Sequence, residues 1–243
     1  MQLAVLSDIH GNLPALRAVL DALDEDAPDA TAVWCAGDFV GYGPWPDECV
    51  QAVAARGWPS VRGNYDEKTL AFPRKQSKWR TSKDPRKFRA FEHAHENLSE
   101  SSRRYLAVLP SEVRQTLGGS HRVLMTHIAP DSDKHGLHPL VPAARFEGIA
   151  RSADADVIIT GHTHWPMVKK VAGVLFVNAG SVGRPGDGDI RAAYAQLTLD
   201  PGAPPHAEIR RVVYPVGEVI AALAPANLPP EFAGLYRHGR GAL

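Results

Sequence analysis

The chain has 243 residues, 44% of them hydrophobic and 22% charged, a composition that excludes a largely disordered protein. Its 27 basic and 27 acidic residues cancel, so bulk charge indicates neither nucleic acid nor an anionic membrane as a partner. We expect residues 1–243 to form one domain, in which any attraction for an anionic substrate comes from a few local groups.

The N-terminal apolar run at residues 3–7 is short and has no basic segment before it. It predicts a buried first strand and not a signal peptide. No later apolar run is long enough to span a bilayer. Cys35 and Cys49 lack the spacing of a metal-binding pair, so we expect two reduced core thiols in a cytoplasmic protein.

The next elements alternate between strand and helix. After strand 3–7, Asn12 can cap a helix that begins near Leu13, because Asn is a favoured N-cap residue. The pattern continues with a strand at 31–37, a helix at 46–56 and a short strand at 59–63. This order predicts parallel strands joined by right-handed crossovers.

The middle of the chain has a different composition. Residues 72–104 are polar and rich in Lys and Arg, and apolar residues recur at helical spacing over 86–108. We interpret residues 72–109 as a helical insertion. A solvated surface is the simpler interpretation of its charges, and a lid over the site or a subunit contact is the functional one.

The second half is rich in short strand patterns. They cover residues 111–117, 121–127, 156–162, 167–171, 174–180, 192–199 and 207–215. Close turns such as Ala172-Gly173 predict antiparallel hairpins, and hence a second sheet packed on the first. Residues 225–243 are rich in Pro and Gly, and we expect a loosely ordered C-terminal tail.

Polar residues follow five of the predicted strands. These segments are Asp8-Ile9-His10, Gly37-Asp38, Gly63-Asn64-Tyr65-Asp66, Thr126-His127 and Gly161-His162-Thr163-His164. Each has an ordinary structural explanation when taken alone, as a turn, a cap or a hydrogen-bonded histidine. Because sites in open α/β sheets form beyond the carboxyl ends of strands, we expect all five to converge on one cleft.

The residue types in these segments suit metal ions. They supply two carboxylates, one amide oxygen and four imidazoles, from Asp8, Asp38, Asn64, His10, His127, His162 and His164. Such a set favours first-row transition metals over Mg or Ca. Seven ligands are too many for one such ion but suit two, if one carboxylate bridges them. The excess positive charge would then hold an anionic phosphate.

The ordered motifs D-I-H, G-D-F-V-G-Y-G, G-N-Y-D, T-H and G-H-T-H resemble those of the calcineurin-like metallophosphoesterases, especially their compact bacterial phosphodiesterase branch. The resemblance covers residues 3 to about 199, and N-A-G-S-V-G-R-P, with D-G-D and Tyr194 after it, extends it. It implies an α/β fold, a four-layer αββα sandwich of two mixed β-sheets flanked by helices, with a dinuclear metal site.

The resemblance also implies a role for each ligand. Asp8, His10 and His164 would bind the first metal, Asn64, His127 and His162 the second, and Asp38 would bridge them as part of the catalytic machinery. A hydroxide held between the two ions would attack phosphorus in line with the leaving oxygen. We expect two divalent ions, with Mn the first choice and Fe, Ni, Zn and Co left open.

Tyr65 departs from the family pattern, which often has a histidine at this position. A phenol donates its proton less readily than an imidazolium at neutral pH. Family members without the histidine are associated with phosphodiesters, so we predict a diesterase in which Asn64, Tyr65 and Arg184 contact the substrate. Ile128 replaces a glycine of related proteins, which predicts a less open loop.

Two other functions remain open from the sequence. One is a phosphomonoesterase or protein phosphatase of the same fold, and the other is a non-catalytic scaffold that keeps this fold. The substrate would be a small phosphate ester or a nucleotide, and a homo-oligomer is not excluded. The filled set of seven ligand positions argues against the scaffold.

Overall fold

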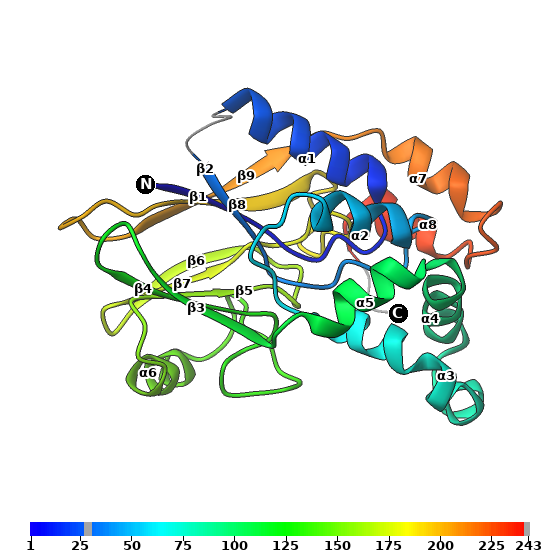
Figure 1. The fold of residues 1–243 in the computed structure, drawn as a ribbon, viewed down its shortest axis with the longest axis horizontal. Coiled ribbons are helices and arrows are strands. Elements are labelled where there is room, and N and C mark those ends of the chain that lie inside the picture. The colour runs from blue at the N-terminus through cyan, green and yellow to red at the C-terminus, as the bar shows by residue number, and fades with distance from the viewer. Residues whose placement is uncertain (27–30, 241–243) are drawn as a thin grey trace.

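The computed structural model describes residues 1–26 and 31–240. Its strands form two mixed sheets (Figure 1). The first sheet has the order β2-β1-β8-β9, with β2 at Thr31–Cys35, β1 at Gln2–Leu6, β8 at Ala192–Thr198 and β9 at His206–Val212. Strand β1 is parallel to β2, as the crossover pattern near the N-terminus predicted. It is antiparallel to β8, so β8 and β9 belong to the first sheet and not to the second, where the sequence placed them.

The second sheet has the order β3-β4-β5-β7-β6. Its strands are β3 (Glu112–Leu117), β4 (His121–Thr126), β5 (Val157–Thr160), β7 (Val174–Asn178) and β6 (Met167–Val171). Strands β4, β5 and β7 are parallel, whereas β3 and β6 pair as antiparallel edges. Both sheets are therefore mixed, as predicted.

The alternation of side chains along the strands builds the layers. Leu3 and Val5 on β1 belong to the core between the sheets, whereas Ala4 and Leu6 belong to the core under the helices. Helices α1 (Leu13–Asp26), α2 (Pro46–Ala54), α7 (Val216–Leu223) and α8 (Phe232–His238) contribute to that outer core. The predicted αββα sandwich is confirmed.

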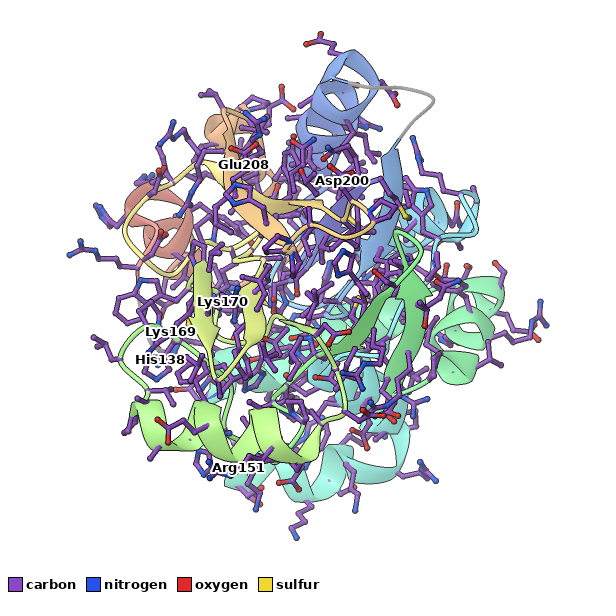
Figure 2. All side chains as sticks on the ribbon, turned by 90° about the vertical axis from the view of Figure 1, so that its left-hand side faces the viewer. His138, Arg151, Lys169, Lys170, Asp200 and Glu208 are labelled. Carbon is purple, nitrogen blue, oxygen red and sulfur yellow. The ribbon has the colours of Figure 1, made fainter. Side chains whose placement is uncertain are left out.

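The outer face of the second sheet carries α6 (Ala143–Ser152). Figure 2 shows Lys169 and Lys170 on β6, between α6, which carries Arg151, and β9, which carries Glu208. Lys169 Nζ lies 4.4 Å from the centre of the Phe146 ring of α6. Its alkyl stem thus covers this helix–sheet contact while its charge stays at the surface.

Three sequence predictions about elements need correction. Residues 59–63 form a single bridge between Cys35 and Ser60, because Pro59 has no N–H to donate and a helix begins at Asn64. That helix, α3 (Asn64–Ser82), starts before the expected insertion boundary at residue 72 and has little apolar periodicity to reveal it. Helices α4 (Pro85–Asn97) and α5 (Glu100–Val108) follow, grouped with α3 at one end of the molecule (Figure 1).

The third correction concerns the C-terminal segment. We expected a loosely ordered tail, but α8 lies within it and buries Phe232 and Tyr236 against the outer core. Apolar residues at helical spacing anchor this helix despite the flanking prolines and glycines. Residues 241–243 of the tail lie outside the described residues.

Both cysteines are free and buried, as predicted. Burial raises the pKa of the Cys35 and Cys49 thiols well above the ordinary range, so both stay protonated. Within residues 1–26 and 31–240, the helices are all too short or too polar to cross a membrane.

Candidate metal centre

Six of the seven candidate ligands follow the end of a strand, as the sequence predicted, whereas Asn64 begins a helix. Asp8 and His10 follow β1, Asp38 follows β2, and Asn64 is the first residue of α3. His127 follows β4, and His162 and His164 follow β5. The two sheets place their carboxyl ends side by side, so these loops meet at one edge of the sandwich.

The backbone of these loops is strained. Positive φ angles occur at Asp8 (55°), His10 (51°), Asp38 (57°), His162 (68°) and His164 (58°). Non-glycine residues seldom adopt this left-handed conformation, and each costs about 1–3 kcal/mol. Five such residues in one cluster show that the fold holds these side chains in place at the expense of local backbone stability.

Two glycines allow the loops to approach one another. A Cβ on Gly63 would lie 2.1 Å from the Asp38 backbone nitrogen, and one on Gly161 would lie 1.9 Å from Ser7 Oγ. Real side chains do not fit at such distances. The glycines of the G-N-Y-D and G-H-T-H segments are therefore required for the close packing of the ligand loops.

The first group of ligands contains His10 and His164. His10 Nδ1 is 3.0 Å from the carbonyl oxygen of Val40, and His164 Nδ1 is 2.6 Å from that of Arg184. A carbonyl oxygen only accepts hydrogen bonds, so each ring carries its proton on Nδ1. The two Nε2 atoms, 3.0 Å apart, then direct lone pairs toward the same point.

Asp8 completes this first group. Its Oδ2 accepts hydrogen bonds from the Ser7 hydroxyl at 2.6 Å and from the backbone N–H of His162 at 2.9 Å. Its Oδ1 is buried with no hydrogen-bond partner among the described residues, although His164 Nε2 is 3.1 Å away. Burial raises the pKa of Asp8, but the imidazoles, His164 foremost, bring it well below its usual value. An ionised, buried oxygen without a hydrogen-bond partner is suited to bind a cation.

The second group converges on Asn64. His127 Nδ1 lies 2.7 Å from the carbonyl oxygen of Ala36, which leaves its Nε2 lone pair facing Asn64 Oδ1 at 3.0 Å. His162 has the same arrangement with its nitrogens exchanged. Its Nε2 is 3.2 Å from the carbonyl oxygen of Lys134, and its Nδ1 is 2.8 Å from Asn64 Oδ1. Two imidazole lone pairs therefore meet an amide oxygen.

Asp38 lies between the two groups. Its Oδ2 is 3.3 Å from His127 Nε2 and 3.7 Å from His10 Nε2. Its Oδ1 accepts the backbone N–H of Tyr65 at 2.7 Å. This hydrogen bond fixes the carboxylate so that one oxygen faces both histidine groups.

The Asp66 carboxylate holds the loop that contains Asp38 through hydrogen bonds to its backbone. Its two oxygens accept backbone N–H groups of Asp38, Phe39 and Gly63 at 2.8 to 3.0 Å. Burial and the nearby Asp38 carboxylate raise the pKa of Asp66 to about 7. Asp66 therefore connects the loop that carries Asp38 to the loop that carries Asn64.

The donor set fits divalent cations. Converging lone pairs of imidazoles, carboxylates and an amide repel one another unless a positive charge lies among them. Two groups of mutually close carboxylate and imidazole atoms are present within the described residues, Asp8 with His10 and His164, and Asp8 with Asp38 and His127. The carbonyl oxygens behind the rings orient the ligands as second-layer partners of metal-bound histidines do.

When no cation is bound, the His127 ring carries a proton. Burial lowers the pKa of His127, but the Asp38 carboxylate opposes this and raises it to about 10. Burial lowers the pKa of His162 and His164. The Asp38–His127 pair is therefore where protons compete most strongly with a cation.

Tyr65 borders the first ligand group. Its ring packs edge-on against His10, with centres 5.1 Å apart, and its hydroxyl forms a hydrogen bond with the hydroxyl of Tyr42. Burial raises the pKa of Tyr65 well above 10, so the phenol keeps its proton. The Arg184 guanidinium lies 4.2 Å from the centre of the Tyr42 ring, which places a positive charge beside the two phenols.

The second ligand group opens onto a groove. A hollow of about 310 Å³ is lined by residues that include Asn64, His127, Ile128 and Arg62. Asn64 is half-buried, whereas Asp8 and His10 are fully buried. The two halves of the site thus differ in access to solvent. The expected narrowing by Ile128 does not close the groove.

The remaining histidines have structural or surface positions. His93 contacts the carbonyl oxygen of Pro44, and His121 contacts that of Asp200. His135, His206 and His238 are exposed. His138 stacks on Trp165 with ring centres 5.9 Å apart.

Sequence reasoning missed the residues that hold the ligand loops from behind. Ser181 donates to the carbonyl oxygen of Asp8 at 2.7 Å, and Asn178 donates to that of Gly161 at 2.7 Å. Asn12 caps α1, as predicted, and also donates to the carbonyl oxygen of Gly183 at 2.8 Å. The N-A-G-S-V-G segment was the available signal, since its polar residues follow a buried strand.

Comparisons with known proteins agree with this geometry. Residues 1–202 match the model of the calcineurin-like phosphoesterase superfamily domain. The protein MJ0912 of Methanocaldococcus jannaschii is 30% identical over 212 residues, which cover 79% of this chain and 80% of that protein.

Two solved structures are similar over nearly the whole chain. A metallophosphoesterase from Sphaerobacter thermophilus is 28% identical with a TM-score of 0.78, covering 98% of this chain and 99% of that one. The hypothetical protein PH1004 from Pyrococcus horikoshii OT3 is 22% identical with a TM-score of 0.88, covering 99% of each chain. The second likeness shows the fold alone.

Proposed function

Because the chain belongs to the calcineurin-like phosphoesterase superfamily, we propose that this metallophosphoesterase is a phosphodiesterase that works with two divalent transition-metal ions, manganese foremost. Residues 1–243 would act as one domain in the cytoplasm. The substrate would be a small phosphate ester or a nucleotide. The observation that carries the proposal is the convergence of four backbone-anchored imidazoles and two carboxylates into two adjacent groups, with Asp38 Oδ2 between them.

The roles proposed for the ligands follow the two groups. Asp8, His10 and His164 would hold one ion, and Asn64, His127 and His162 the other, with Asp38 Oδ2 shared between them. Two such ions supply Lewis acidity and lower the pKa of bound water. Asp38 carries out no proton transfer in this proposal, because its Oδ1 is engaged by the Tyr65 N–H.

Residues beside the ligands would orient the phosphate. Arg184 offers the guanidinium that can pair with a phosphate oxygen, and Asn64 lies at the mouth of the groove where substrate enters. Tyr65 stays protonated and hydrogen-bonded to Tyr42, so it can donate to a phosphate oxygen but is a poor acid for the leaving group.

The preference for diesters rests on this weak acidity. A diester with a good leaving group releases the departing oxygen with little protonation, so a weak acid such as Tyr65 is sufficient. A monoester anion gains more from a proton-donating imidazole beside it. The protein phosphatase alternative uses the same ligands but gains from a histidine where this chain has Tyr65.

The test is hydrolysis of bis(p-nitrophenyl) phosphate beside p-nitrophenyl phosphate, with Mn²⁺ and with a chelator. We expect chelator-sensitive turnover with higher kcat/KM for the diester. A preference for the monoester would overturn the diesterase assignment but keep the metal site. An absence of turnover with every metal offered would favour a non-catalytic scaffold.

A further inference from the structure

Two lysine ammonium groups lie on aromatic rings beside the metal centre. Lys68 Nζ is 5.3 Å from the centre of the Tyr65 ring, and Lys83 Nζ is 4.6 Å from the centre of the Trp79 ring. Both lysines are half-buried and come from the helical segment α3–α4, at the end of the molecule seen in Figure 1. Their stems are held in place by the rings, so the charges have defined positions.

A continuous row of rings connects these lysines to the ligands. The Tyr65 ring centre is 5.1 Å from that of His10 and 4.9 Å from that of Phe91. The Phe91 ring centre in turn is 5.5 Å from that of Trp79. Lys83 Nζ also lies 5.7 Å from the Phe91 ring. Packed rings therefore connect the two ammonium groups to His10 of the metal centre.

These lysines have no carboxylate partner. Among the ion pairs within residues 1–26 and 31–240, none includes Lys68 or Lys83, even though Glu67 is the neighbour of Lys68 in sequence. Two arginines of the same segment are paired, Arg86 with Asp84 at 2.7 Å and Arg89 with Glu92 at 2.7 Å. The carboxylates of this segment thus neutralise Arg86 and Arg89 and leave Lys68 and Lys83 outside the ion pairs of the described residues.

The electrostatic environment of the two lysines favours a bound anion. Burial lowers the pKa of Lys68; the Asp38 and Glu67 carboxylates raise it, and Lys83 and Lys87 lower it. Burial and Lys87 also lower the pKa of Lys83. The ammonium groups repel one another, and Lys68 lies close enough to the metal centre for the Asp38 carboxylate to influence its pKa. An anion placed among them would relieve the repulsion.

We propose that Lys68 and Lys83 bind a second phosphate group of the substrate, one that is not hydrolysed. This inference rests on the proposed function and narrows the substrate class to phosphodiesters, or dinucleoside phosphoanhydrides, that carry another phosphate. The Tyr65 ring separates the two positions, so the scissile phosphate lies at the metal centre and the second phosphate lies beyond the ring. The second phosphate can come from the phosphorylated end of a short nucleic-acid strand or from a dinucleoside polyphosphate.

The experiment compares matched substrates in the Mn²⁺-loaded protein. Thymidine dinucleotide with a terminal 5′-phosphate is set beside the same dinucleotide without it, and a dinucleoside tetraphosphate forms the second arm. We expect kcat/KM to be about fivefold higher for a substrate with the additional phosphate, the effect of one partly solvated ion pair. The substrate with the higher kcat/KM, either the 5′-phosphorylated dinucleotide or the tetraphosphate, identifies the source of the second phosphate.

The variants Lys68→Gln and Lys83→Gln should remove this preference and leave hydrolysis of bis(p-nitrophenyl) phosphate within about twofold of wild type, because that diester has no second phosphate. Lys75→Gln, an exposed lysine of the same helix, should keep the preference. Equal kcat/KM for both dinucleotides and the tetraphosphate in wild type would overturn the inference. So would a preference that survives both variants.

A binding measurement separates this inference from the proposed function. Calorimetry should show that thymidine 3′,5′-bisphosphate binds more tightly than thymidine 5′-monophosphate, and that Lys68→Gln abolishes the difference. If no diester is hydrolysed but this difference is found, the proposed function fails and the anion site stands. If both nucleotides bind equally while the diester is hydrolysed, the anion site fails and the function stands.

Discussion

The two halves of the metal centre use the same ligand chemistry but differ in their surroundings. Asp8, His10 and His164 are buried, and their rings are fixed by carbonyl oxygens of neighbouring loops. Asn64 and His162 are half-exposed, and the groove of about 310 Å³ opens beside Asn64 and His127. A closed half suits tight retention of an ion, whereas an open half suits exchange of ion and substrate. We expect function to depend on both halves and metal retention chiefly on the first.

The shared carboxylate should have the largest effect. Asp38→Asn removes the charge that both halves face, so we expect kcat/KM for bis(p-nitrophenyl) phosphate to fall by about 1000-fold. The matched control is Asp154→Asn, an exposed carboxylate that pairs with Arg122 far from the ligands. Turnover of Asp38→Asn within tenfold of wild type would refute a shared ligand at this position.

The protonation of His127 in the open half can be tested by the pH dependence of the free energy of unfolding. In the chelated protein the pKa of His127 is raised to about 10 from an ordinary 6.5. The bound proton therefore stabilises the fold fully below pH 6.5, and this contribution is lost as pH rises through 10. We expect the free energy of unfolding to fall by about 3 kcal/mol between pH 7 and pH 10. His127→Gln should flatten this profile, and an equally steep fall in that variant would contradict the assignment.

Metal retention should separate the two halves directly. We expect His164→Ala to weaken binding of the tighter ion by about 100-fold and His162→Ala to weaken binding of the looser ion by about tenfold. After dialysis, metal analysis should find about one ion per chain in His162→Ala and fewer in His164→Ala. His138→Ala, outside the ligand groups, is the control. If His164→Ala kept more metal than His162→Ala, burial of the ligands would not determine the affinity for metal at this centre.

Tyr65 should have the smallest effect of these changes. Tyr65→His introduces a side chain that titrates near neutral pH, so we expect the ratio of monoester to diester kcat/KM to rise about tenfold. Tyr42→Phe removes the hydroxyl partner but no acid, and should leave this ratio unchanged. An unchanged ratio in Tyr65→His would show that residue 65 does not act at the leaving group.

The sequence was sufficient to predict the sandwich and the placement of the ligands, because both depend on local signals. Buried strands such as residues 3–7 are continuous apolar runs, and four of the five ligand segments follow a strand. The start of α3 at Asn64 was missed because its first turns contain few apolar residues. The α8 helix was missed because the flanking prolines obscured its apolar face.

The local geometry of the site could not be predicted in the same way. The carbonyl oxygens that orient His10, His127 and His164 belong to residues distant in sequence, and any residue type offers a carbonyl. The positive φ angles at the ligands also contradict residue preferences. Lys68 and Lys83 looked like ordinary surface charge until the structure placed them on the Tyr65 and Trp79 rings.

The most direct test of the dinuclear centre is a crystal structure of the Mn²⁺-loaded protein with anomalous data collected at the manganese edge. The account predicts two anomalous peaks about 3.5–4 Å apart, one among Asp8, His10 and His164 and one among Asn64, His127 and His162, with an oxygen of Asp38 touching both. A single peak, or two peaks that Asp38 does not share, would contradict it.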